Sequence, residues 1–183
     1  MNVANTTATH ILFSISNTLD VTNGGKSITG KLRVSNGQIE FGLDAVANGA
    51  NTIAIGNGAK TGTDNSSAYG YSANADGASS LALGSNTTAG GEGSVAVGVD
   101  AVSSVANTTA LGYGATSSQT GATSIGYSAI ANSTNTSSLG YNAKATASGA
   151  TSLGYGSETQ GSYGVSVGAG AKASGDYGVA LGY

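Results

Sequence analysis

A glycine recurs every 14 residues from position 42 to the end of the chain, with no insertion or deletion. The eleven members of this column are Gly42, Gly56, Gly70, Gly84, Gly98, Gly112, Gly126, Gly140, Gly154, Gly168 and Gly182. A fixed period of this length is typical of repeat proteins, in which each repeat packs against its neighbours along one axis. The period therefore constrains the architecture more than any single motif does.

Each glycine ends a short β-forming phrase, such as Ile53 to Gly56 or Val95 to Gly98. The residue before the glycine is large and apolar, the residue three before it is mostly a β-former, and Ala or Ser lies between them in every turn except the first, where Glu40 stands. This alternation predicts a strand. Small side chains three and five residues after the glycine predict a second short strand, and turn-forming residues separate the two.

The chain should therefore fold as stacked turns, each reading strand, turn, strand, turn. We expect strands of about five residues, with like residues above one another and the backbone paired along the stack. Leu, Ile and Val before the glycines are expected to fill a thin interior, with alanines opposite them letting the two sheets approach. Ten steps of roughly 4.8 Å give a rod of about 48 Å. Low-complexity disorder does not keep such a column in register, so we disfavour it.

Residues 1–37 do not follow the period and are expected to form a separate β-rich segment, with residues 38–183 forming the repeat domain. Ile11, Phe13 and Ile15 alternate with their neighbours as in a strand. The stretches 19–24 and 32–37 both end in Asn-Gly, which is typical of a strand followed by a turn. Because the end of a strand stack is an unpaired edge, we expect this segment to cap the first turn and attach the rod to another protein.

Composition argues against several classes of partner. The six basic residues are spread over the chain, so no basic patch for nucleic acid is predicted. No apolar run approaches the roughly 20 residues of a membrane span, so we expect no membrane insertion. The first twelve residues lack the basic and apolar regions of a secretory signal. There is no cysteine, so the rod must be held by stacking and association rather than by disulfides.

No catalytic, cofactor-binding or metal-binding residue is predicted, and the chain is not expected to be an enzyme. His10 is the single histidine, and with no cysteine a zinc site lacks a ligand set. Asp44 and Asp100 share a column but lie four turns apart, near 19 Å, beyond the roughly 10 Å of a catalytic carboxylate pair. The period accounts for the glycines, and no helix follows them as in a phosphate-binding loop.

One tyrosine column exceeds what the fold needs, and its members directly follow the repeat glycine. They are Tyr71, Tyr113, Tyr127, Tyr141, Tyr155 and Tyr183, four of them on consecutive turns, while Tyr163 and Tyr177 form a second short stack. Two interpretations stay open. The first five tyrosines of the column form either a packed ladder at a roll edge or between subunits, or an amphipathic stripe that contacts a glycan or receptor.

The phrase Ser94–Ala101 and its relatives across residues 39–183 resemble the YadA-like head of trimeric autotransporter adhesins, a repeat that also occurs in phage tail fibres. The resemblance covers about four-fifths of the chain. It implies an all-β, left-handed parallel β-roll, three copies packed around an axis as a homotrimer, and a role in surface adhesion. The residues add a reason for association, since the Ala and Ser column opposite the large apolar column would allow close packing against another roll.

Complete adhesins of this family carry a secretion signal, a neck, a coiled-coil stalk and a membrane anchor, none of which is visible here. We therefore expect a non-enzymatic fibre protein of a phage virion, on the tail or the head. It would bind other virion proteins through residues 1–37 and attach to a host-surface receptor or glycan. The alternative is a head-domain fragment of a bacterial trimeric autotransporter adhesin at the bacterial cell surface.

Overall fold

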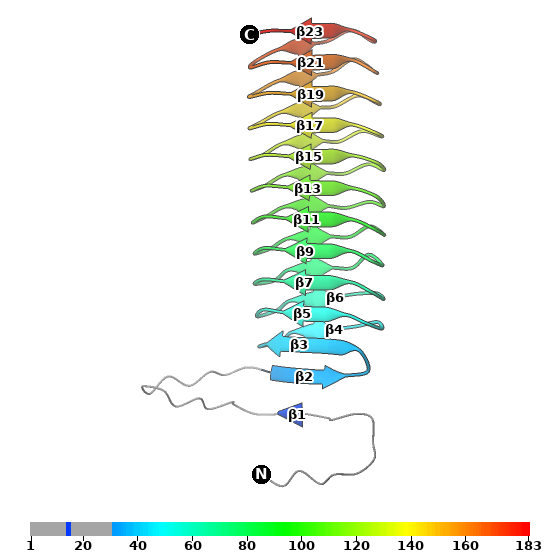
Figure 1. Cartoon of the computed structure of the whole chain (residues 1–183), viewed down its shortest axis with the longest axis vertical. Helices are drawn as coiled ribbons and strands as arrows, with labels where there is room; N and C mark the ends of the chain where they lie inside the picture. The colour runs from blue at the N-terminus through cyan, green and yellow to red at the C-terminus, as the bar shows by residue number, and fades with distance from the viewer. Residues whose placement is uncertain (1–13, 16–30) are drawn as a thin grey trace, which may run out of the picture.

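The computed structural model describes residues 14–15 and 31–183, and all regular structure in these two ranges is β-strand. The rungs stack along one axis, from β3 (Gln38–Gly42) to β23 (Val179–Leu181), as Figure 1 shows. The repeat therefore forms a parallel β-solenoid with one turn per 14 residues, as the glycine period predicted.

Each rung contributes one strand to each of two facing sheets. The long sheet has thirteen strands, in the order β1, β2, β3 and then the odd-numbered strands to β23, and the short sheet contains the ten even-numbered strands from β4 to β22. The strands of the long sheet are β1 (Ser14–Ile15), β2 (Lys31–Ser35), β3 (Gln38–Gly42), β5 (Ile53–Ile55), β7 (Ser67–Tyr69), β9 (Leu81–Leu83), β11 (Val95–Val97), β13 (Thr109–Leu111), β15 (Thr123–Ile125), β17 (Ser137–Leu139), β19 (Thr151–Leu153), β21 (Val165–Val167) and β23 (Val179–Leu181). The strands of the short sheet are β4 (Val46–Ala47), β6 (Lys60–Thr61), β8 (Asn74–Ala75), β10 (Thr88–Ala89), β12 (Val102–Ser103), β14 (Thr116–Ser117), β16 (Ile130–Ala131), β18 (Lys144–Ala145), β20 (Glu158–Thr159) and β22 (Lys172–Ala173).

Neighbouring rungs pair in parallel with a register shift of one repeat, so that Ala96 pairs with Ala82 on one side and Ala110 on the other. The strands in the repeat are mostly two or three residues long, shorter than the five expected. The turns take up the remaining residues. From β3 onward, each strand of the long sheet ends at the repeat glycine or directly before it, because the backbone bends there with a φ that L-residues rarely adopt.

Gly126 illustrates why this corner requires glycine. Its φ is +132°, and a Cβ atom placed there would lie 2.4 Å from the carbonyl oxygen of Gly140 in the next rung. The amide of Gly126 donates a hydrogen bond to the carbonyl of Leu111, at 2.8 Å, which ties the corner to the previous rung. All eleven glycines of the column have φ values between +115° and +140°.

Small side chains build the interior of the roll, so the expectation that Leu, Ile and Val fill it is wrong. Ala96 and Ala110 of the long sheet are 0% exposed. Ala115 and Ser117, in or next to strand β14 of the facing short sheet, are also 0% exposed. The large residue before the glycine points outward, and Leu111 remains 42% exposed. The same observation overturns the idea that the Ala and Ser column faces another roll. Tight corners hold the two sheets close, and the space between them admits only small residues.

Buried hydroxyl groups in the second half of the roll are hydrogen-bonded across the interior. Ser117 Oγ donates to the carbonyl oxygen of Thr109 at 2.7 Å and lies 2.9 Å from Ser124 Oγ. Thr159 Oγ1 lies 2.8 Å from Ser166 Oγ, one rung later. Because these polar groups find partners inside, serine and threonine can replace alanine in the interior at little cost.

An antiparallel hairpin covers the first rung. β2 pairs with β3 through a turn at Asn36 and Gly37, whose φ values are +51° and +74°, which confirms the strand and turn predicted for residues 32–37. Glu40 replaces the inward alanine here, is buried, and accepts hydrogen bonds from Arg33 Nη1 at 3.2 Å and from the amide of Ala47 at 2.9 Å.

β1 adds to the free side of β2, with Ile15 opposite Leu32. The rest of the strand expected at residues 11–15 and the turn expected at residues 19–24 lie outside the described residues. The division of the chain at residue 37 and the attachment role of the first segment stay predictions.

Candidate binding surfaces

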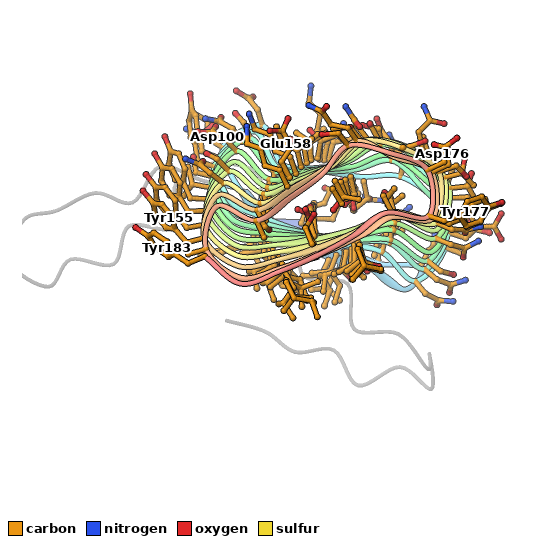
Figure 2. All side chains as sticks on the ribbon, turned by 90° about the horizontal axis from the view of Figure 1, so that it is seen from above. Asp100, Tyr155, Glu158, Asp176, Tyr177 and Tyr183 are labelled. Carbon is orange, nitrogen blue, oxygen red and sulfur yellow. The ribbon has the colours of Figure 1, made fainter. Side chains whose placement is uncertain are left out.

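The outward side of the long sheet is a continuous apolar strip, which we call the apolar face. The residue before the repeat glycine contributes to it on every rung. The residue three before the glycine contributes where it is aliphatic, and five rungs carry serine or threonine there, at Ser67, Thr109, Thr123, Ser137 and Thr151. The aliphatic members are Ile39, Ile53, Ile55, Leu81, Leu83, Val95, Val97, Leu111, Ile125, Leu139, Leu153, Val165, Val167, Val179 and Leu181. In Figure 2 this face lies on the side of the roll opposite Glu158. Leu83 and Leu153 are 45% and 44% exposed in the isolated chain. A long apolar strip of this kind is typical of an interaction surface.

The outward side of the short sheet is different in size and chemistry. Each rung contributes one outward residue to it, and the resulting column contains polar, charged and aliphatic side chains. Its members from β6 to β22 are Lys60, Asn74, Thr88, Val102, Thr116, Ile130, Lys144, Glu158 and Lys172. The two outer sides of the roll are therefore not equivalent, because only the long sheet exposes a continuous apolar surface.

Four tyrosines of the predicted column stack directly on one another. The ring centroids of Tyr113, Tyr127, Tyr141 and Tyr155 are separated by 5.1, 4.9 and 5.1 Å in succession, with interplanar angles of 7 to 8°. Tyr71 lies outside the stack, because the next two rungs carry Ser85 and Val99 in this column; Ala169 likewise separates Tyr155 from Tyr183. Figure 2 places Tyr155 and Tyr183 at one edge of the roll.

The uppermost ring of this stack is the most exposed of the four. Tyr155 is 65% exposed, against 45 to 50% for Tyr113, Tyr127 and Tyr141. The stacking shows that the rings pack within one chain. Whether the hydroxyl-bearing edge also contacts a ligand stays a prediction at this point.

The second pair, Tyr163 and Tyr177, also stacks, with centroids 5.5 Å apart, on the other edge of the roll. Both residues have a φ of +56°, an uncommon value for a bulky side chain. The equivalent position of other rungs holds residues better suited to this conformation, such as Asn107 and Asn135. The sequence correctly predicted that the two rings stack. It did not predict that both residues adopt a positive φ, because tyrosine is not a residue type typical of that conformation.

The short sheet carries a ladder of three charged residues that the sequence analysis did not identify. Lys144, Glu158 and Lys172 lie on the paired strands β18, β20 and β22. Lys172 Nζ lies 3.0 Å from Glu158 Oε2, and Gln160 Nε2 donates to Glu158 Oε1 at 2.7 Å. The hydrogen bond from Gln160, followed by that from Lys172, lowers the pKa of Glu158 below its ordinary value. The signal was available as a Lys, Glu, Lys alternation at intervals of one repeat.

A hollow of about 400 Å³ lies beside this ladder. Its lining comes from the outward column of the short sheet and from the turn that precedes it. The lining residues are Ser128, Ile130, Asn142, Lys144, Gly156, Glu158 and Lys172. This hollow combines concavity, charge and hydrogen-bonding groups.

The described part of the chain contains no group of three or more His, Cys, Asp or Glu side chains placed to hold a metal ion. His10 lies outside the described residues. Asp44 and Asp100 belong to the same turn column on separate rungs, as the sequence indicated, and Asp100 receives a hydrogen bond from Asn86 at 3.3 Å. Nor does any helix in residues 14–15 and 31–183 have the length and apolar character needed to cross a membrane.

The rung geometry and the column chemistry agree with one known repeat. The model of the YadA head domain repeat matches the sequence over residues 41–59, 47–73, 64–87, 75–101, 89–115, 106–129, 117–142, 131–157 and 160–183. Together these segments cover well over half of the chain. The chain belongs to the YadA head family. It is a YadA-like head domain of an adhesin-type protein, and this fold serves structural and binding roles.

Two further comparisons concern curated proteins and solved structures. No curated protein matches the sequence. The YadA-like head is similar to the collagen-binding domain of the Yersinia adhesin YadA, with 20% identity over 78% of this chain and 73% of that one, and a TM-score of 0.39. A superposition this weak supports no argument about ligands or assembly of the present chain.

Proposed function

We propose that this protein is the non-enzymatic, homotrimeric adhesive head of a surface fibre. The observation that carries the proposal is the apolar face of the long sheet. Its large aliphatic side chains lie outside the interior, and Leu83, Leu111 and Leu153 are 42 to 45% exposed in a single chain. Burying apolar surface contributes roughly 25 cal/mol per Å², so a strip running along the whole stack favours association strongly.

A second and a third copy of the same chain are the partners that fit this face best. The face is a ladder in which every column repeats once per rung, as the pairing of Val97 with Leu83 and Leu111 illustrates. Only a surface with the same rise per rung stays in register with it over the whole length, and an identical chain has that rise. Membership of the YadA head family supports three copies around one axis, a closed cyclic arrangement of the kind common in homo-oligomers.

The carrier of the fibre is either a phage virion or a bacterial cell surface, and family membership supports both equally. In the first case residues 1–37 would bind other virion proteins and the roll would contact a host receptor or glycan. In the second the roll would be the exposed head of a trimeric autotransporter adhesin. Immunogold electron microscopy with antibodies against the roll distinguishes the two, since label appears on particles in one case and on the bacterial envelope in the other.

The assembly is tested by placing a charge on the apolar face. Leu111→Asp would bring three carboxylates together at the centre of a trimer, so sedimentation analysis should show a shift from trimer to monomer. Val102→Asp is the matched control, because Val102 points outward from the short sheet and should leave the trimer intact. A wild-type protein that sediments as a monomer, or equal dissociation by both variants, would contradict the proposal.

A further inference from the structure

The hollow beside Lys144 has a chemical character that suits a specific ligand class. Lys144 and Lys172 are two of the six basic residues of the entire chain, and Glu158 is the only acid in the lining. Both oxygens of the Glu158 carboxylate already have partners, Lys172 and Gln160. Within the described residues the Lys144 ammonium forms no ion pair, so the hollow presents a single positive charge to an incoming group.

The remaining lining provides hydrogen bonds and an apolar contact. Ser128 and Asn142 supply a hydroxyl and an amide from the turn column, and Ile130 supplies a hydrocarbon surface below Lys144. A sugar ring needs this combination, because it carries several hydroxyl groups around a partly apolar ring. Lys144 and Lys172 flank a single carboxylate, that of Glu158, so the lining carries one positive charge in excess, which matches one ligand carboxylate rather than a densely charged chain.

Two glycines make the hollow open. The turn column also carries glycine in lower rungs, at Gly58 and Gly114, but only Gly156 and Gly170 stand on consecutive rungs. A Cβ atom placed on either glycine would meet nothing within 4 Å. Since neither residue has a side chain, the surface between the charged ladder and the tyrosine edge stays free.

Tyr155 lies directly beside this opening. It precedes Gly156 and ends the stack of four rings, and because Ala169 occupies the next rung, no ring covers its upper side. Figure 2 shows Tyr155 at the edge of the roll and Glu158 on the adjoining broad side, opposite the apolar face. A ligand extending from the hollow across Gly156 would reach the aromatic ring, and it would remain accessible when the apolar face is covered.

We propose that this hollow binds an acidic glycan, with the carboxylate of one sugar on the Lys144 ammonium and a neighbouring sugar against the ring of Tyr155. The proposal deepens the proposed adhesive function and rests on it for its biological role. It assigns ligand recognition to the outer corner of the roll between the tyrosine edge and the short sheet.

The experiment compares two probes that differ by one acidic sugar, 3′-sialyllactose and lactose. Binding to the full-length protein is measured by saturation-transfer NMR and isothermal titration calorimetry. A charge-assisted hydrogen bond to Lys144 should make the acidic trisaccharide bind about tenfold more tightly than lactose. Lys144→Gln should remove this preference, while Lys60→Gln, in the same column but far down the roll, should preserve it.

A second pair of variants tests the shape of the hollow. Gly156→Asn should fold normally, because Asn142 occupies the same column one rung earlier with φ of +53°, close to the +61° of Gly156. Its side chain should fill the opening and abolish binding of the acidic probe. Gly58→Asn introduces the same change at the same column on a distant rung and should have no effect.

A third variant tests the ring. Tyr155→Val places the residue found at Val99 in the same column and should weaken binding severalfold without altering the preference for acid. Absence of binding by both sugars, equal binding of the two, or equal effects of test and control variants would overturn the inference. Sedimentation of the same sample separates the two proposals. If the protein is a trimer but binds no acidic sugar, only the proposed glycan site is overturned. If it is a monomer that binds the acidic sugar, only the proposed trimer is overturned.

Discussion

Ala110 and Leu111 are neighbours in the strand β13, yet they occupy opposite environments. Ala110 faces the interior and is fully buried, whereas Leu111 faces outward and is 42% exposed. In most domains the large apolar residues form the core and small residues fill gaps around them. Here the interior is limited by volume, and the outward side carries the large residues. The inward column therefore fixes the shape of the rung, and the outward column determines what the roll associates with.

The largest effect should follow from enlarging the inward column. Ala110→Leu places three extra carbon atoms between two closely spaced sheets, so the rungs above and below must separate. We expect a loss of about 3 kcal/mol or more in the free energy of unfolding, at the upper end for overpacked cores. Chemical denaturation followed by circular dichroism measures this loss.

Thr109→Leu is the matched control for this prediction, on the same strand but facing outward. Leu81 already occupies that column two rungs earlier, so the site accepts leucine. The stability of this variant should change far less than that of Ala110→Leu, because no second sheet of the same roll confines the outward side. Equal destabilisation by Ala110→Leu and Thr109→Leu would show that the space available to a side chain is no smaller inside the roll than outside it.

A smaller effect should follow from removing a buried hydroxyl without changing volume much. Ser117 Oγ donates to the Thr109 carbonyl and contacts Ser124 Oγ, and the equivalent residue in the next rung is Ala131. Ser117→Ala should therefore fold but lose about 1 kcal/mol, the usual net value of one hydrogen bond.

The outward neighbour of Ser117 provides its control. Thr116 Oγ1 makes only a long hydrogen bond of 3.4 Å to the carbonyl of Gly114. Thr116→Ala should change the free energy of unfolding by a few tenths of a kcal/mol. If the two alanine variants were equally stable, the buried hydroxyl groups would add nothing to the interior beyond the packing of their carbon atoms.

The sequence was sufficient to predict the stacked architecture. The glycine column and the turn residues specify rung length, register and strand pairing, because each depends only on local backbone geometry repeated without interruption. Alternation also indicated that Ala110 and Leu111 face opposite ways. It could not indicate which of them faces inward, since alternation is symmetric and the closeness of the two sheets is set by the corners. The missing signal lay in the uniformity of the columns, because the inward column is Ala or Ser on every rung after the first, whereas the outward one varies from Val97 to Tyr69.

The candidate site was only partly predictable for a related reason. The tyrosine stack follows from the period, because equal residues on consecutive rungs must lie one above another. The opening of the hollow depends on the lack of a side chain at Gly156 and Gly170. Its charge depends on the ion pair of Glu158 with Lys172, in which Lys144 takes no part. In the sequence those two glycines look like any other turn residue. Only the arrangement of three neighbouring rungs shows that they open a surface.

The smallest effect should come from the outward charged ladder, where solvent screens each interaction. Gln160 and Lys172 hold the pKa of Glu158 below its ordinary value in the folded chain. A carboxyl of this kind adds stability above its unfolded pKa and loses it as the pH falls through the folded pKa. Glu158→Gln should therefore be less stable than wild type at neutral pH by less than about 1 kcal/mol, the usual value for an exposed ion pair. The difference should vanish on acidification well below pH 4.5, the ordinary value for this group, and shrink in concentrated salt. Thermal unfolding of both proteins across this pH range measures the difference. A gap that widened toward acid would mean that the folded chain favours the protonated carboxyl, and that the ladder on the short sheet does not hold Glu158 as an anion.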